Sequence, residues 1–70
     1  MKSYIAKIER KSEKFGGGVK ITTEFFGVRA NDEIEARKDF EKMLDKRESI
    51  LYVLEESNVP AEDLEAYNNE

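Results

Sequence analysis

The stretch KFGGGVK, residues 14–20, places three glycines between two lysines, a composition that can bind phosphate. In a phosphate-binding loop the spacing G-x-x-x-x-G-K-[ST] leads from a strand into a helix. That spacing is absent here, and the residues that follow, VKITTEFF, favour a strand. The stretch therefore predicts the tip of a β-hairpin, where glycine supplies a positive φ without steric cost.

Other catalytic chemistry has few candidates in this chain. It contains no cysteine and no histidine, which excludes thiolate chemistry, disulfides and the commonest general base and metal ligand. The chain has 16 Asp and Glu residues, but we expect their carboxylates on solvent-exposed faces, and their spacing is not that of a calcium-binding loop. We expect a protein that is not an enzyme and that has no cofactor and no metal site.

Two strands must position the glycine stretch. YIAKIERK alternates apolar and polar residues, and VKITTEFFGVRA is rich in β-branched and aromatic residues. They predict a hairpin over residues 3–30. With a three-residue loop, Phe15 pairs with Val19, and one face of the hairpin collects six apolar residues: Tyr4, Ala6, Ile8, Phe26, Val28 and Ala30.

A long helix is predicted to follow. Asp32 and Glu35 form a D-x-x-E capping pattern. From Ala36 to Leu54 the apolar residues fall within a stripe of roughly 120°, which predicts one helix over residues 32–57. Pro60 then begins a short helix over residues 60–68. In the alternative, ILYVLEE, residues 50–56, forms a third strand, because Ile, Tyr and Val favour strands.

These elements predict a single α+β domain over residues 1–70. A long antiparallel hairpin carries one long helix packed on it and a short C-terminal helix, in the order ββαα. The alternative order is ββαβ. In either case, a sheet with open edges invites pairing with another chain.

The apolar side of the hairpin changes halfway along its length. Beyond the six residues above, the apolar side chains lie on the opposite face. Either a β-bulge near TTEFF rejoins the two apolar sets, or the outer half presents an apolar patch to a partner. The second interpretation gives a set of partner-binding residues: Phe15, Val19, Ile21 and Phe25, with Lys14 and Lys20.

Charge is distributed unevenly along the chain. The net charge is −4, but residues 1–20 carry +4 and residues 48–70 carry −7. An acidic second surface for a basic partner is predicted at Glu55, Glu56, Glu62, Asp63 and Glu65. The overall sign disfavours nucleic acid. Contact of nucleic acid with the basic hairpin arm stays an alternative, because an aromatic ring among lysines can stack on a base.

The sequence contains no apolar run of membrane-spanning length, and MKSYIAKIER lacks the core of a signal peptide. We therefore expect a cytoplasmic protein that does not interact with membranes.

The passage TEFFGVRANDEIEARKDF, residues 23–40, resembles a layout found in small phage-encoded proteins. In that layout a strand ends in small or β-branched residues, and an acidic cap opens a helix of the E-A-R type. Small domains with lopsided charge are similar to host-takeover and anti-defence proteins of phages, including anti-CRISPR proteins. The resemblance implies a protein that binds and blocks a host protein in the host cell cytoplasm, and it supplies no functional residues.

Together these features predict a small non-enzymatic protein-binding module that inhibits or regulates a larger protein. The alternative is a self-associating structural protein, a homodimer that forms through its open sheet.

Overall fold

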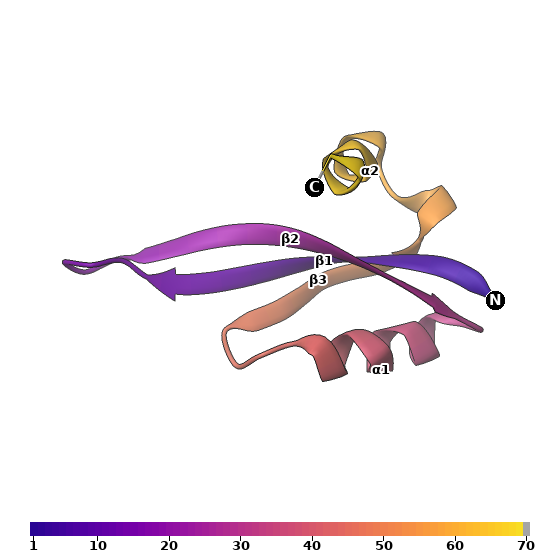
Figure 1. Cartoon of the computed structure of the whole chain (residues 1–70), viewed down its shortest axis with the longest axis horizontal. Helices are drawn as coiled ribbons and strands as arrows, with labels where there is room; N and C mark the ends of the chain where they lie inside the picture. The colour runs from indigo at the N-terminus through magenta and orange to yellow at the C-terminus, as the bar shows by residue number, and fades with distance from the viewer. Residues whose placement is uncertain (70) are drawn as a thin grey trace.

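The computed structural model describes residues 1–69 of the 70-residue chain. The α+β class is confirmed, because a three-stranded antiparallel sheet is combined with helices (Figure 1). In chain order the elements are β1 (Lys2–Glu13), β2 (Val19–Ala30), α1 (Glu33–Met43), β3 (Glu48–Glu55), the 3-10 turn η1 (Glu56–Asn58) and α2 (Ala61–Asn68).

The predicted hairpin is confirmed as β1 and β2. Their register is unbroken from Lys2 opposite Ala30 to Glu13 opposite Val19. The connecting loop, residues 14–18, is longer than the three residues expected, so the register differs by two positions. Because side chains alternate with a period of two, this shift leaves every residue on its predicted face.

The predicted long helix over residues 32–57 is corrected in its second half. The helix α1 ends at Met43, and residues 48–55 form β3 beside β1, as the alternative ββαβ order proposed. Asp45 drives the change of direction: its Oδ1 accepts a hydrogen bond from the Arg47 N–H at 2.8 Å, and its own N–H donates to Glu48 Oε1 at 3.1 Å. Such local bonds replace helical ones. The short C-terminal helix is confirmed as α2.

One face of the sheet packs against α1. Asp32 caps this helix as predicted, because its Oδ1 accepts a hydrogen bond from the Glu35 N–H at 2.8 Å. The helix buries Ala36 and Phe40 completely. They pack with Val53 of β3 and with the predicted six residues of the hairpin, namely Tyr4, Ala6, Ile8, Phe26, Val28 and Ala30.

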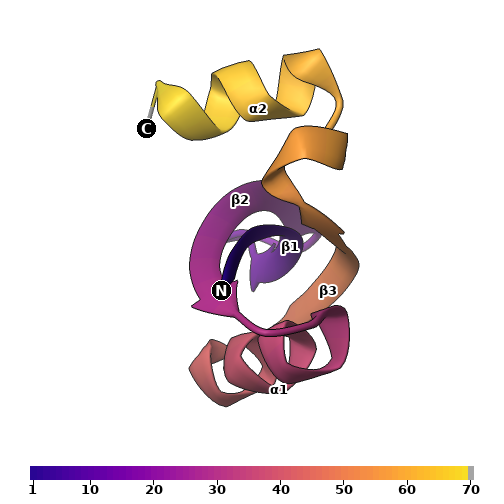
Figure 2. The same cartoon turned by 90° about the vertical axis from the view of Figure 1, so that its right-hand side faces the viewer.

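The opposite face packs against η1, α2 and the residues that connect them. Ile5, Phe25 and Val59 are buried there, and Tyr52, Leu54, Leu64 and Tyr67 pack around them. The sheet is thus covered on both sides, as the end-on view shows (Figure 2). Of the apolar residues beyond the switch, Phe25 is covered by this second helix, whereas Phe15, Val19 and Ile21 stay exposed, and the β1–β2 register contains no bulge near TTEFF. The register irregularity lies instead between β1 and β3, at Lys7 and Ile8.

The sheet is covered at one end only. The ladder between β3 and β1 ends where Arg10 is opposite Glu48, and β1 and β2 continue past this point as a two-stranded arm (Figure 1). We call residues 11–21 the arm and the remainder the base. The arm contributes to the elongated shape of the molecule, which measures 46 × 25 × 15 Å.

Candidate partner-binding surface

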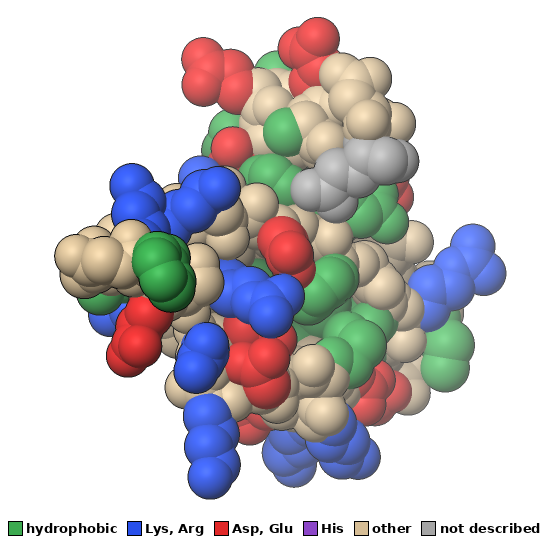
Figure 3. Space-filling view, turned by 60° about the vertical axis from the view of Figure 1, so that its left-hand side comes forward, with side chains coloured by type: hydrophobic (Ala, Val, Ile, Leu, Met, Phe, Trp, Pro, Cys, Tyr) green, Lys and Arg blue, Asp and Glu red, His purple; other side chains and the backbone are tan. Residues whose placement is uncertain are grey.

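The arm exposes apolar side chains together with lysines. Phe15 at its tip is fully exposed, and Val19 and Ile21 are each 59% exposed. Lys11, Lys14 and Lys20 are exposed around them. The space-filling view, with the arm coming forward, shows hydrophobic and basic side chains side by side (Figure 3). Five of the six residues predicted to bind a partner are therefore solvent-accessible in this one part of the molecule.

The turn at the tip of the arm holds Phe15 away from the sheet. Gly16, Gly17 and Gly18 all have positive φ, between 92° and 99°. The Lys14 N–H donates to the Gly18 carbonyl at 3.0 Å, and the Gly17 N–H donates to the Lys14 carbonyl at 3.2 Å. L-residues with side chains rarely adopt positive φ, so this closure requires glycine. The aromatic ring is consequently presented on a hydrogen-bonded turn.

Phe25, the sixth predicted residue, lies in the core and is outside this exposed surface. Its side chain is only 7% exposed and packs with Ile5 and Val59. The Lys7 ammonium lies 6.0 Å from the centroid of its ring, within the range of a cation–π contact. Phe25 shares a strand face with Ile21, but the cover provided by α2 begins between the two.

The predicted acidic surface divides into partnered and exposed residues. Glu55 Oε1 lies 2.9 Å from Lys2 Nζ, and the hydrogen bond and charge of Glu55 raise the pKa of Lys2. Asp63 is also partnered within the chain. Glu56, Glu62 and Glu65 are exposed. These three carboxylates are the part of the set that a basic partner could reach.

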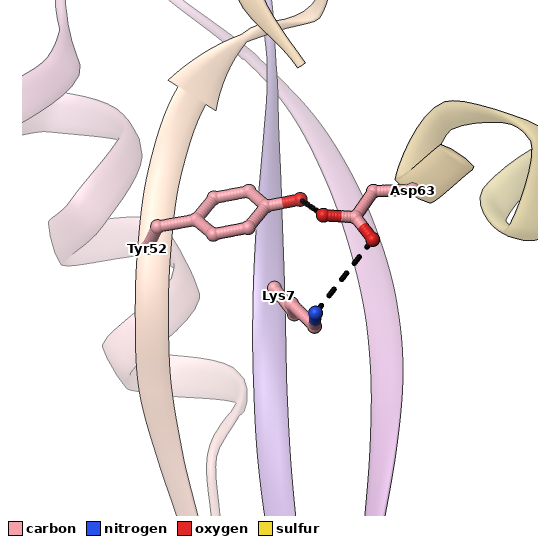
Figure 4. Close-up of polar contacts among 3 residues, drawn as sticks. All are labelled: Lys7, Tyr52 and Asp63. Atoms are coloured by element: carbon pink, nitrogen blue, oxygen red, sulfur yellow. Dashed lines mark hydrogen bonds and ion pairs between the residues drawn. The ribbon is translucent and has the colours of Figure 1, made fainter. Parts of the chain in front are cut away.

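Asp63 joins three elements (Figure 4). Its Oδ2 accepts a hydrogen bond from Tyr52 Oη of β3 at 2.8 Å, and its Oδ1 lies 3.6 Å from Lys7 Nζ of β1. Burial raises the pKa of Tyr52 to about 12, with further contributions from the hydrogen bond to Asp63 and from its negative charge. Tyr52 therefore remains a neutral donor at physiological pH, and the cluster fastens α2 to the sheet.

A glycine in the middle of β2 allows another close contact. A Cβ atom added at Gly27 would lie 2.5 Å from Tyr67 Oη, so any other residue would displace this ring from its position against the strand. Tyr67 and Gly27 also line a hollow of about 240 Å³ beside Ile5, Arg29 and Glu56. An isolated glycine within a strand pattern is typical of such close approach.

Lys7, Tyr52, Gly27 and Tyr67 are not among the site residues predicted from the sequence. The signal for Gly27 was its place inside EFFGVRA. The strand interpretation of ILYVLEE would have indicated Tyr52. In that strand Tyr52 lies opposite Lys7, and the two side chains share a face of the sheet.

Within residues 1–69, acidic side chains do not gather in any group of three or more that could hold a metal ion. None of the helices in this part of the chain is long and apolar enough to cross a bilayer.

The chain matches no family model, no curated protein and no solved structure. What the molecule offers a partner is therefore inferred from its own surface. An apolar and basic arm extends from one end, and the other is a covered base that includes the exposed acids of the predicted set, Glu56, Glu62 and Glu65.

Proposed function

We propose that the chain is a small protein-binding module without enzymatic activity, which inhibits or regulates a larger protein by docking its arm. The observation that carries the proposal is the full exposure of Phe15 at the end of a two-stranded arm that no other element of residues 1–69 covers. Large exposed apolar side chains that cluster on a protruding element are typical of interaction sites.

The energetics favour an apolar pocket on the partner. Burying an exposed Phe or Ile side chain contributes about 1.5–3 kcal/mol, and aromatic residues are frequent anchors of protein interfaces. The hairpin ladder already fixes the arm backbone, so docking costs little ordering entropy. Lys11, Lys14 and Lys20 fit a partner whose pocket is rimmed by carboxylates, because complementary charges steer association.

Under this proposal the partner is a host protein and the setting is the host cell cytoplasm. Support for that setting comes from the resemblance of residues 23–40 to the strand–cap–helix layout of small phage proteins.

The test compares proteins captured from a cell lysate by immobilised variants. The arm variants are Phe15→Ser and Ile21→Ser. The matched control is Ile34→Ser, because Ile34 of α1 is 68% exposed and lies on the base. Circular dichroism first verifies that all three variants are folded.

We expect a protein that is retained by the wild type and by Ile34→Ser but lost with both arm variants. Calorimetric titration of that purified protein should then show a loss of affinity of at least tenfold for Phe15→Ser, equivalent to about 1.4 kcal/mol. Equal binding by the wild type and both arm variants would contradict the proposal.

A further inference from the structure

Within residues 1–69, the outer edge of β2 has no strand paired with it. The sheet order is β2-β1-β3, so β2 pairs with β1 on one side only. We propose that a second copy of this chain pairs with β2 through its own β2, antiparallel and related by a two-fold axis. The two sheets would join into one. This inference goes beyond the proposed function and does not depend on it.

The hydrogen-bonding pattern shows which residues of β2 face outward. The Lys14 N–H donates to the Gly18 carbonyl, so these two form a hydrogen-bonded pair. Such pairs alternate along an antiparallel ladder, which makes Arg10 and Thr22 another. The Lys11 N–H points the other way, to the Arg47 carbonyl at 3.1 Å. The odd-numbered residues of β2 therefore direct their N–H and C=O groups away from β1.

Charge selects the register of the two β2 strands. With Thr22 on the two-fold axis, Lys20 of each copy lies opposite Glu24 of the other, so one register makes two ion pairs. Both belong to non-hydrogen-bonded pairs, in which side chains approach more closely. In the same register Ile21 lies opposite Thr23, and their outward backbone groups form the new hydrogen bonds.

Other arrangements lack this complementarity. An axis at Glu24 would oppose two carboxylates, and like charges directly opposite are destabilising. The outer edge of β3 is also open, but β3 contains glutamates at both ends and no Lys or Arg. Two copies of β3 therefore have no opposite charges to pair, and β2 is the edge that fits a second copy.

The single chain leaves these groups available. Neither Lys20 nor Glu24 forms a salt bridge within residues 1–69. Val19 and Ile21 are each 59% exposed and would lie beside Phe25 and Thr23 of the second copy. The same register brings the end of each arm alongside the base of the other copy.

A cysteine cross-link tests the register directly, because the chain has no cysteine of its own. In Thr22→Cys the two new side chains meet across the axis, where Cα atoms about 4.5 Å apart suit a disulfide. The matched control is Thr23→Cys, whose two copies are diagonal neighbours about 7–8 Å apart. We expect mild oxidation to give a covalent dimer with Thr22→Cys and mainly monomer with Thr23→Cys.

Charge reversal provides a second test that does not involve cysteine. Lys20→Glu and Glu24→Lys each place like charges opposite one another twice, so each should weaken dimerisation about tenfold. An equal mixture of the two variants restores both ion pairs in a heterodimer, and the double variant K20E/E24K restores them in a homodimer. Sedimentation velocity from micromolar to near-millimolar concentration measures all four samples and the wild type.

Recovery of the dimer in the mixture would support the proposal, because a purely structural role of either residue could not produce it. A wild-type protein that stays monomeric throughout the concentration range would overturn the proposal. So would equal cross-linking of the two cysteine variants, or singly reversed variants that dimerise as well as the wild type.

Discussion

The base and the arm share the same two strands but differ in what covers them. In the base, α1 lies on one face of the sheet and α2 on the other, whereas the arm has neither helix and no third strand. Length explains the difference. A strand of 12 residues reaches about 40 Å, while the 11 residues of α1 reach only about 16 Å. The uncovered part is therefore set by the mismatch between strand and helix lengths.

Composition follows the same division. Ala6, Ala30 and Ala36 are completely buried in the base, where small side chains let α1 approach the sheet. The arm combines glycines at its turn with lysines and a few apolar side chains. Lysine on an exposed strand protects its edge against unspecific pairing, so partners that do bind the arm must satisfy its charges.

The largest expected difference between base and arm is the loss of stability on replacing one phenylalanine in each. Phe25→Ala removes a buried ring from between the sheet and α2 and should lower the free energy of unfolding by about 3 kcal/mol. Phe15→Ala removes a ring that touches solvent and should change it by less than about 0.5 kcal/mol. Urea denaturation of both variants measures the contrast. Similar losses in the two would show that the tip is packed against the molecule in solution.

The contact between Gly27 and Tyr67 predicts a smaller effect within the base. Gly27→Ala places a methyl group 2.5 Å from Tyr67 Oη and should cost about 1–3 kcal/mol by displacing the ring. In the background Tyr67→Phe the nearest atom is gone, so the same substitution should cost less. A double-mutant cycle measured by urea denaturation gives the coupling between the two positions. Purely additive effects would contradict the contact.

Tyr52 predicts the smallest effect, and one that depends on pH. Tyr52→Phe removes the hydrogen bond to Asp63 and should cost about 1–2 kcal/mol at neutral pH. The pKa of Tyr52 is raised in the folded state to about 12, from the ordinary tyrosine value of 10.0. A raised pKa means that this stabilisation is complete below pH 10 and is lost as pH rises towards 12.

The difference in unfolding free energy between the wild type and Tyr52→Phe should therefore shrink across that alkaline range. Comparing the two proteins at each pH cancels the titration of the other tyrosines and of the lysines. A difference that stays constant from pH 9 to pH 12 would mean that Tyr52 does not donate to Asp63.

The hairpin faces could be predicted from the sequence because they depend only on the alternation of residues. An error of two in the register left Tyr4, Ala6 and Ile8 on the correct face. The cap at Asp32 was also predictable, since its hydrogen bond to Glu35 is local. Both features are determined by residues close in sequence.

The second half of the predicted helix is wrong because the same residues fit both a helical and a strand periodicity. Ile50, Leu51 and Leu54 continue a helical stripe from Phe40, yet Ile50 and Val53 also face the core from a strand that contains a bulge. The turn at Asp45 and the pairing of these residues with β1, which is distant in sequence, decide in favour of the strand. The burial of Phe25 was also missed because it depends on residues distant in sequence, namely those of α2.

The ladder between β1 and β2 is unbroken from the base to the turn, so the arm and the base share one continuous hairpin. The end of this hairpin that lies opposite the turn is held between the two helices. We therefore expect a ligand that tilts the tip to move the backbone of Ile5 and Ile8 as well, whose side chains pack against opposite helices. Binding of a ligand at the tip of the arm should then change the rate of amide hydrogen exchange in α2, well away from the point of contact.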